Sequence, residues 1–483
     1  MIGNLVKNYK NLKAFNLLKQ FIPKGFSTQK KMSLDSQIDI QPSKFMQKLI
    51  NPTIFELIVP LSQKYQSINL ASGFPDWETP EFLCNAVTEA FKLPEHQYAP
   101  VGGHPALIQK LCERYSKSLN RNILPQNISV GLGGSGVIYD IYTAFLNEGD
   151  ELIVFEPFFE YHSKEAKLLG VNVKACSLIE PEDFENGEWQ IDFKQFESLI
   201  NDKTRMIVLN SPHNPTGKVF TREEYQKIAD IVKKYPKVLV LADDVYETLI
   251  YDNKEFPRFV DIPGMFERTL QVFSLGKLFS CTGWRIGFCI GPEQFIKIVR
   301  ATHAIICYSV HRPVQIGFAK ALDEAKSKYM GTDDNYEVNI RKRFEKNRNV
   351  ILEGFKNLNA NLKLNKPQGG YFIVGSLKDH VGKIPRKYFF KDFENVPDGD
   401  ALLGDTPFEE FEQAEVTPDV AFFKYMIIEK GVTVIPMSSF YIQDDEKNLK
   451  NIKGRYFFRI ALPRKEETIN SAFKKLNQTL KQN

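Results

Sequence analysis

Short apolar runs alternate with longer segments of helical spacing between about residues 100 and 300. The apolar runs are bounded by turn-forming residues and are too short for helices, so they are interpreted as buried strands. Between them, apolar residues recur every three or four positions, as on one face of a helix. Strands that alternate with helices form a mostly parallel sheet covered on both faces, so the pattern predicts an α/β fold. The strands are predicted at residues 151–155, 206–210, 238–242 and 270–274.

Two of the predicted helices begin with recognisable signals. Pro105 stands at the start of one helical segment, where its missing backbone N–H costs nothing. Thr221 and Glu224 form a capping box, in which each side chain bonds the backbone N–H of the other residue. We therefore expect a helix to follow each signal.

A second domain is predicted after residue 330, because 483 residues are too many for one ordinary core. A helical stretch at about 336–358 opens this region, and apolar runs at 368–374 and 456–461 predict its strands. Residues 376–416 are rich in Asp, Glu, Pro and Gly and are interpreted as a long surface insertion. The predicted division is an N-terminal arm at 32–75, a large domain at 76–330 and a small domain at 331–483 that contains the insertion.

Residues 1–31 differ from the rest of the chain. They contain seven lysines among apolar residues, and Asp35 is the first acidic residue of the chain. A basic amphipathic segment of this kind is typical of a mitochondrial presequence, which predicts the mitochondrial matrix as the destination. The alternative is a disordered basic tail on a cytoplasmic protein.

Composition excludes several classes of protein. The formal net charge is +4, and the N-terminal lysines account for this excess, so no basic surface remains for a nucleic acid. No apolar run reaches the length of a membrane span. The six cysteines lack CxxC spacing, which predicts reduced thiols and no structural metal site.

Residues able to carry chemistry follow the predicted strands, at the edge of an α/β sheet where ligands bind. Ser274 and Lys277 come at the end of one strand, and Arg285 follows them within Gly-Trp-Arg-Ile-Gly. A lysine amine bonds an aldehyde and the planar fork of an arginine grips a phosphate. This spacing therefore suits a phosphorylated aldehyde cofactor, although either basic residue alone is more often a solvated surface charge.

Asp243 and Tyr246 follow the strand at 238–242, and Asn214 follows the strand at 206–210. A carboxylate at a buried strand end needs a cationic partner, which a protonated pyridine nitrogen would supply. Tyr246 and Asn214 would then reach the phenolic oxygen of the same ring. The alternatives are a helix N-cap for Asp243 and a plain turn for Asn214.

Three further features are less specific. The glycine-rich run around Gly134 and Ser135 precedes a helical segment whose first N–H groups would bind phosphate, although a dinucleotide loop looks similar. Phe158 or Phe159 would stack on a cofactor ring, or both pack in the core. Arg459 lies in an apolar run and would bind a substrate carboxylate, unless it forms an internal salt bridge.

Together these motifs resemble the fold type I PLP-dependent aminotransferases. Within that group they are most similar to the kynurenine aminotransferases, which are also known as glutamine–phenylpyruvate transaminases and cysteine-S-conjugate β-lyases. The resemblance implies an aspartate aminotransferase-like fold and runs from about residue 68 to the C-terminus, the insertion excepted. The stretches that carry it, besides those above, are 68–76, 147–150, 156–159, 217–220, 263–269 and 280–284.

The resemblance implies pyridoxal 5'-phosphate (PLP) as the cofactor. It also implies that Tyr98 reaches the cofactor of a neighbouring subunit, and hence a homodimer. The remaining roles that it implies are Lys277 as the covalent anchor, Asp243 at the ring nitrogen, Asn214 and Tyr246 at the phenolic oxygen, Phe159 on the ring, Ser274, Arg285 and the backbone of Gly134 and Ser135 at the phosphate, and Arg459 at the substrate carboxylate.

Three positions depart from the pattern of this family. Ala71 stands where the family has a glycine that contacts the substrate through its backbone, so its methyl group is expected to narrow the pocket. Ser135 replaces a tyrosine of the active-site wall, and His213 stands where relatives often have asparagine. The insertion lies in the domain that closes over the substrate in this family.

The implied reaction moves the amino group of a large neutral or aromatic amino acid, such as kynurenine, glutamine, phenylalanine or methionine, to a 2-oxo acid. One alternative is β-lyase activity at the same site. The other is a non-catalytic subunit of a mitochondrial assembly, which the presence of Lys277, Asp243 and Arg459 disfavours.

Overall fold

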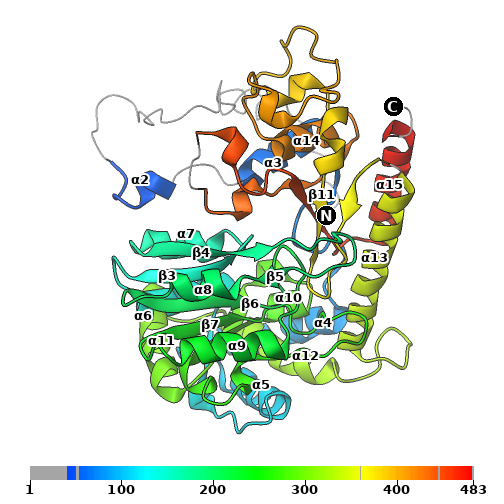
Figure 1. Cartoon of the computed structure of the whole chain (residues 1–483). Helices are drawn as coiled ribbons and strands as arrows, with labels where there is room; N and C mark the ends of the chain where they lie inside the picture. The colour runs from blue at the N-terminus through cyan, green and yellow to red at the C-terminus, as the bar shows by residue number, and fades with distance from the viewer. Residues whose placement is uncertain (1–40, 50–53, 359, 444–446, 481–483) are drawn as a thin grey trace.

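The computed structural model describes residues 41–49, 54–358, 360–443 and 447–480. The predicted presequence at 1–31 lies outside the described residues and stays a prediction, as does the arm up to residue 40. Within the described part of the chain, no helix has both the length and the apolar character of a membrane span. Figure 1 shows a lower body around a large sheet and an upper body around a smaller one.

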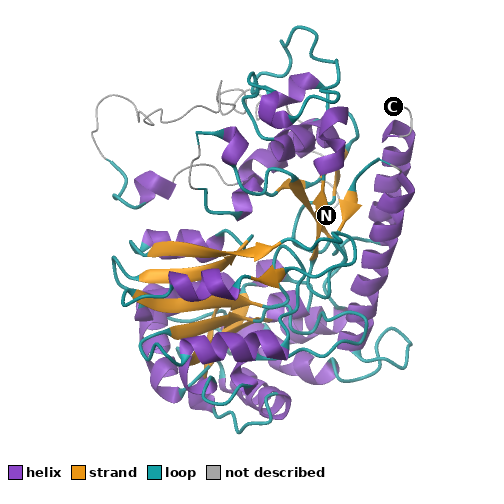
Figure 2. Cartoon of the chain, in the orientation of Figure 1, coloured by secondary structure: helices purple, strands orange, loops and turns teal. Residues whose placement is uncertain are grey.

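A mostly parallel sheet forms the centre of the lower body (Figure 2). Its strands are β2 (Ile128–Leu132), β3 (Glu151–Glu156), β4 (Asn172–Ile179), β5 (Gln190–Ile191), β6 (Thr204–Asn210), β7 (Leu239–Asp243), β8 (Thr269–Ser274) and β9 (Ile286–Ile290). They lie in the order β2-β9-β8-β7-β6-β3-β4-β5, and the pairings from β8 to β4 are all parallel. The pairings of β9 with β2 and β8, and of β4 with β5, are antiparallel. The predicted fold class is confirmed.

Helices cover both faces of this sheet because successive residues of a strand point to opposite sides. In β6, Met206 and Val208 belong to a buried cluster with α6 and α11, whereas Ile207 and Leu209 belong to one with α8 and α9. The helices are α2 (Met46–Leu49), α3 (Ile54–Lys64), α4 (Glu81–Ala90), α5 (Pro105–Ser118), α6 (Gly133–Phe145), α7 (Tyr161–Leu168), α8 (Phe193–Leu199), α9 (Arg222–Val232), α10 (Leu275–Leu278), α11 (Glu293–Ile306), α12 (Arg312–Glu324), α13 (Tyr336–Leu358), α14 (Pro418–Ile428) and α15 (Glu466–Leu480).

Local signals placed several of these elements correctly. The four predicted strands of the lower body are present, each with an end moved by one or two residues. The capping box at α9 is formed, with Glu224 N donating to Thr221 Oγ1 at 3.1 Å and Thr221 N donating to Glu224 Oε2 at 2.9 Å. The helix after the glycine-rich run begins earlier than expected, at Gly133, so Gly134 and Ser135 lie in its first turn.

The upper body contains a four-stranded sheet in the order β10-β11-β14-β13. Its strands are β10 (Lys363–Leu364), β11 (Phe372–Ser376), β13 (Ile435–Pro436) and β14 (Phe457–Ala461), and β1 (Ile68–Asn69) pairs with β12 (Val432–Thr433) beside it. The strand predicted at 368–374 begins later than expected, because β11 starts at Phe372. Residues 368–370 instead donate backbone hydrogen bonds to the lower body, to the carbonyl groups of Gly217 and Leu249.

The insertion at 376–416 is more than a surface loop. It contains short 3₁₀ turns at Lys378–Lys383, Arg386–Phe389 and Phe408–Glu410. Phe389 is fully buried, and its ring lies 6.0 Å from Phe408 and 5.6 Å from Phe411. The acidic and proline-rich composition hid these aromatic residues, which belong to the same large hydrophobic cluster as Ala421 and Phe422 of α14.

Helix α13 runs along one side of the molecule and packs against both bodies (Figure 1). Near its start, the ring of Tyr336 stacks 5.4 Å from Phe279, which follows α10 of the lower body. Near its end, the ring of Phe355 lies 6.2 Å from Phe458 of β14 in the upper body. The helix predicted at 336–358 is thus confirmed, and it connects the two bodies.

Candidate active site

The carboxyl ends of β6, β7 and β8 meet at one edge of the large sheet, since these strands are parallel neighbours. The register places Asn210 beside Asp243 and Asp243 beside Val272. Lys277 follows β8 directly, and the charges of Asp243, Arg285 and Arg459 all act on its pKa. The structure therefore brings residues from both bodies together at the predicted edge.

Lys277 has the environment of a reactive amine. It lies in α10, where Ser274 Oγ accepts the backbone N–H of Lys277 at 3.3 Å, and its Nζ donates to the backbone oxygen of Gly73 at 3.0 Å. Burial, followed by the positive charge of Arg459, lowers the pKa of Lys277 to about 7, although Asp243 opposes the shift. Close to neutral pH, a substantial fraction of this amine is uncharged and able to act as a nucleophile or a base.

Asp243 is buried and has one carboxylate oxygen free. His162 Nε2 donates to Asp243 Oδ2 at 2.9 Å, and both side chains are almost inaccessible to water. Oδ1 is also buried and has no hydrogen-bond partner within the described residues. The N-cap interpretation is wrong, because the chain after β7 forms a turn and not a helix. An unpaired buried carboxylate oxygen suits a protonated ring nitrogen.

Two residues of this cluster were missed in the sequence. His162 lies at the start of α7, three residues after Phe159, and its position beyond the end of β3 was the available signal. Tyr371 has its ring 4.7 Å from Lys277 Nζ and 4.8 Å from the ring of Tyr246, and its hydroxyl donates to the backbone oxygen of Lys277 at 2.9 Å. No local pattern marked Tyr371, because it reaches the site from the connection between the two bodies.

Tyr246 and Asn214 lie beside this cluster. Tyr246 is buried, and burial together with the charge of Asp243 raises the pKa of its hydroxyl well above the ordinary range, so the phenol remains a donor. Asn214 N donates to Asn210 Oδ1 at 2.7 Å, and Asn214 Oδ1 accepts Arg459 Nη1 at 3.0 Å. With its oxygen held by Arg459, Asn214 keeps its NH₂ group as the donor for a ligand.

Arg459 is only 2 % exposed, and no carboxylate within the described residues pairs with it. Its guanidinium carbon lies 3.8 Å from the ring centroid of Phe372 and 4.8 Å from that of Phe440, and its Nε is buried without a partner. Burial lowers the pKa of Arg459 to about 9, so it remains charged at neutral pH. The internal salt bridge is thereby disfavoured, and an anionic ligand is the partner that this buried cation requires.

The residues predicted to bind phosphate lie together at the start of α6. Arg285 Nη2 donates to Ser135 Oγ at 3.0 Å and to the backbone oxygen of Leu132 at 3.1 Å. Gly133 has a φ of +71°, which L side chains rarely adopt, and a Cβ there would lie 2.5 Å from Arg285 Nη2, so glycine suits this position. The first turn of α6, with Gly134 and Ser135, directs free N–H groups to the same place, which suits a phosphate.

Three further predicted site residues take no part in the contacts described above. Phe159 is half-buried and stacks on Tyr161 with ring centroids 5.1 Å apart, at the edge of the cluster. Tyr98 is 75 % exposed in the single chain, with its ring 4.9 Å from that of Tyr308. Ala71 is fully buried in a hydrophobic cluster, and the expectation that its methyl group narrows the substrate pocket stays a prediction.

Within the described residues, no group of three His, Cys, Asp or Glu residues could hold a metal ion. The residues of the cluster fit PLP. The uncharged amine of Lys277, the free Asp243 Oδ1 and the Arg285–Ser135 pair offer a partner for the aldehyde, the ring nitrogen and the phosphate respectively.

Curated proteins of known activity resemble the chain over most of its length. The kynurenine–oxoglutarate transaminase of Dictyostelium discoideum is 32 % identical over 450 residues, which covers 89 % of this chain and 95 % of that protein. The kynurenine–oxoglutarate transaminase 1 of Mus musculus is 29 % identical over 426 residues, or 86 % and 92 % of the two chains. The chain is therefore similar to these enzymes over more than nine-tenths of their length.

Solved structures and a family model agree with this. The crystal structure of Bna3p from Saccharomyces cerevisiae matches with a TM-score of 0.79 and 28 % identity, over 92 % of this chain and all of that one. The aspartate aminotransferase of Rhizobium meliloti, at 22 % identity and a TM-score of 0.75, shows the same fold. The model of the family described as aminotransferase class I and II, whose members are PLP-dependent, matches residues 65–476. This chain belongs to the class I and II aminotransferase family.

Proposed function

We propose that this aminotransferase takes the amino group of a large neutral or aromatic amino acid, such as kynurenine, glutamine, phenylalanine or methionine, and passes it to a 2-oxo acid. The observation that carries the proposal is Arg459, a buried cation without a carboxylate partner in the described residues, between the rings of Phe372 and Phe440. Similarity to proteins named kynurenine–oxoglutarate transaminase supports the same substrate class.

A neutral side chain is favoured because the second buried arginine near the site is already occupied. Arg464 donates to the backbone oxygens of Asn69, Ser72, Phe74 and Pro463, all at 2.7 Å or less. An arginine saturated in this way is not available for a carboxylate on the substrate side chain. The aromatic rings around Arg459 instead offer apolar contact to a large substrate.

Each residue of the cluster has a defined task in the reaction. PLP, when bound, supplies an aldehyde that bonds amines and a ring that withdraws electrons from the substrate Cα. Arg459 holds the α-carboxylate, which fixes the Cα beside Lys277, and Lys277 Nζ moves the proton at that carbon. Asp243, itself held by His162, would pair with the ring nitrogen and favour its protonated form, while Tyr246 and Asn214 would donate to the phenolic oxygen.

A homodimer and the mitochondrial matrix belong to the same proposal. Tyr98, Tyr308, Ile305 and Ile306 are all exposed apolar residues, and Ile305 is 87 % exposed, which favours a surface that another chain covers. The matrix rests on the basic amphipathic pattern of residues 1–31 alone. The proposed localisation is tested by comparing the location in cells of the full chain with that of a chain lacking residues 1–31.

The first prediction concerns substrates. Purified protein loaded with PLP should transaminate kynurenine, glutamine, phenylalanine or methionine with a kcat/KM at least about tenfold above that for aspartate, because a second carboxylate finds no free arginine. A panel of amino acids against several 2-oxo acids measures this. A clear preference for aspartate would contradict the proposal, and release of pyruvate and a thiol from a cysteine conjugate would reveal β-lyase activity.

The second prediction concerns the pH at which Lys277 captures PLP. Because burial lowers the pKa of this amine to about 7, the reactive uncharged fraction grows about tenfold per pH unit below 7 and is nearly complete above 8. The rate at which PLP-free protein gains the visible absorbance of the bound cofactor should follow this curve. A rate of PLP capture that still rises tenfold between pH 8 and 9 would show that Lys277 has the pKa of an ordinary lysine. The variant Lys277→Ala should not gain the absorbance of the bound cofactor.

The third prediction separates function from stability at Arg459. Loss of its bond to the substrate carboxylate is worth about 2–5 kcal/mol, so Arg459→Met should raise KM for the amino acid by about 30-fold or more. Because Arg459 pairs with no carboxylate among the described residues, its loss strands no buried anion there, and the Tm of the substrate-free protein should not fall. Arg464→Met is the matched control and should lower Tm, since it leaves several buried carbonyl groups unpaired.

The fourth prediction tests the shared site. Lys277→Ala and Tyr98→Asp should each be inactive, the second because a carboxylate would approach the phosphate of the neighbouring subunit. A mixture of the two proteins should recover part of the activity, because one site of a mixed dimer has both residues intact. Absence of recovery after demonstrated subunit exchange would mean that each chain builds its site alone.

A further inference from the structure

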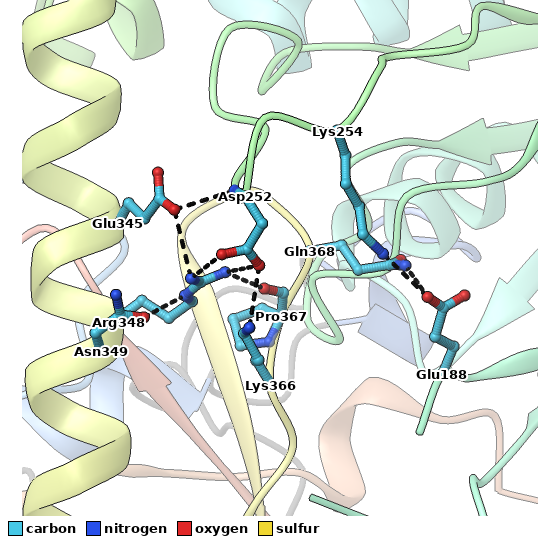
Figure 3. Close-up of polar contacts among 9 residues, drawn as sticks. All are labelled: Glu188, Asp252, Lys254, Glu345, Arg348, Asn349, Lys366, Pro367 and Gln368. Atoms are coloured by element: carbon cyan, nitrogen blue, oxygen red, sulfur yellow. Dashed lines mark hydrogen bonds and ion pairs between the residues drawn. The ribbon is translucent and has the colours of Figure 1, made fainter. Parts of the chain in front are cut away.

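A polar network links the lower body to the middle of helix α13 (Figure 3). On the lower body it begins at a tight turn, in which Lys254 N donates to the backbone oxygen of Tyr251 at 3.1 Å. The two central residues, Asp252 and Asn253, have positive φ angles of 57° and 53°, as in a type I′ turn. Asp and Asn tolerate this conformation better than other non-glycine residues, so the turn presents its carboxylate in a fixed direction.

The centre of the network is a two-pronged ion pair between Asp252 and Arg348. Arg348 Nη2 donates to Asp252 Oδ1 at 2.7 Å and Arg348 Nη1 donates to Asp252 Oδ2 at 2.8 Å. The side chain of Arg348 is only 1 % exposed and that of Asp252 is 35 % exposed. Arg348 Nη1 also donates to the backbone oxygen of Pro367 at 3.2 Å, and Asp252 N donates to Glu345 Oε1 at 3.1 Å. Parallel bonds of this kind fix orientation as well as distance.

The other ion pairs of the network lie closer to solvent. Lys254 Nζ lies 3.1 Å from Glu188 Oε1, a side chain that Gln368 also contacts, and Lys366 Nζ lies 3.2 Å from Asp252 Oδ2. The side chains of Lys254, Glu188 and Lys366 are each more than two-fifths exposed, and such pairs contribute little energy. The Asp252–Arg348 pair is therefore the interaction that fixes the turn at Asp252 relative to helix α13.

The connection at residues 366–370 is held between this pair and the lower body. Gln368 N and Gly369 N donate to the backbone oxygen of Gly217 at 2.9 and 3.0 Å, and Gly370 N donates to that of Leu249 at 2.9 Å. A Cβ at Gly217 would lie 2.2 Å from Pro367 Cβ, so only glycine permits this approach. Gly217 and Leu249 are three residues after Asn214 and Tyr246, so the connection touches the segments that carry two site residues.

The same connection continues directly into the active site. Tyr371 follows Gly370, and its hydroxyl donates to the backbone oxygen of Lys277 at 2.9 Å. Phe372 comes next, with its ring 3.8 Å from the guanidinium carbon of Arg459. Any displacement of residues 366–370 is therefore passed to Lys277 and Arg459, which have to face opposite ends of the same amino acid.

Because helix α13 is long, a small tilt at Arg348 would produce a larger displacement at the end of the helix. Its 23 residues span about 35 Å at 1.5 Å per residue, and Arg348 lies near the middle, between the contacts with the lower and the upper body. A tilt of about 5° at Arg348 would move the end of the helix, about 15 Å away, by about 1.3 Å. A misplacement of about 1 Å in an active site is enough to cost about a hundredfold in rate.

We propose that Asp252 and Arg348 are positioning residues of the aminotransferase, whose pairing sets the distance between Lys277 and Arg459 through the connection 366–372. Neither residue touches the amino acid or the cofactor. The inference rests on the aminotransferase reaction and not on which amino acid is preferred. It applies to whichever amino donor the wild-type protein uses best.

Two variants test this inference. Asp252→Asn keeps the left-handed turn and removes the charge, but it leaves the buried Arg348 without its two-pronged carboxylate partner, with only the longer contact to Glu345 Oε1 at 3.6 Å, and is expected to lower Tm. The double variant Asp252→Asn/Arg348→Met removes the charge on both sides, and replacement of a buried pair by apolar side chains is often neutral for stability. Lys346→Met is the matched control, since Lys346 lies on the same helix and pairs with Glu466 on the surface at 60 % and 57 % exposure.

Both variants should lower kcat/KM for the best amino donor by about tenfold to a hundredfold, with PLP affinity changed less than about twofold. The double variant should do so at a Tm close to that of the wild type. Backbone hydrogen exchange at Gln368, Gly369 and Gly370 should become faster, while exchange in β14 stays unchanged. Lys346→Met should behave as the wild type in every measurement.

If the double variant regains wild-type kcat/KM together with wild-type Tm, the pair contributes stability alone and the inference is wrong. It is equally wrong if kcat/KM falls while exchange at residues 368–370 is unchanged. A failure of the proposed substrate class looks different, because the wild-type protein would then prefer another donor while the variants could still be compared on that donor. Should no donor be found, the exchange measurement decides by itself.

Discussion

The parallel register of β6, β7 and β8 is the constraint on which the site depends. It places Asn210 beside Asp243 and brings the segments after three strands to one edge of the sheet. Asn210 fastens this edge with two bonds, donating to the backbone oxygen of Asp243 at 2.8 Å and accepting Asn214 N at 2.7 Å. A slip of one residue in this register would turn Asp243 to the other face of the sheet and separate it from His162.

The site contains several buried charged groups whose ion pairs and hydrogen bonds within the described residues are incomplete. Lys277, Arg459 and one oxygen of Asp243 are all removed from water, and burial is the largest cause that lowers the pKa of both cations. Such groups cost stability unless a partner arrives. The substrate carboxylate and the cofactor ring supply those partners, so the free energy stored in desolvation is recovered when they bind. The surrounding aromatic rings, notably Phe372 and Tyr371, exclude water and hold the cations in place.

The sequence predicts elements whose signals are local and leaves out those that depend on distant contacts. The strands, the capping box at Thr221 and the spacing of Asp243 and Lys277 could be read directly. His162 and Tyr371 could not, because their roles come from bonds across 81 and 94 residues of chain. The composition of 376–416 was misleading for a different reason, since a few aromatic residues outweigh many polar ones once they pack together.

The contacts of Arg464 bear on when the site can form during synthesis of the chain. Its guanidinium holds the backbone of Asn69, Ser72 and Phe74, the segment whose Gly73 oxygen accepts Lys277 Nζ. Residues near both ends of the chain therefore define the surroundings of the lysine in its middle. During synthesis, the strands of the large sheet are made well before Arg459 and Arg464, so the pocket around Lys277 is incomplete until those two residues have been made. We therefore expect the cofactor to be bound late, after the sheet that carries Lys277 has formed.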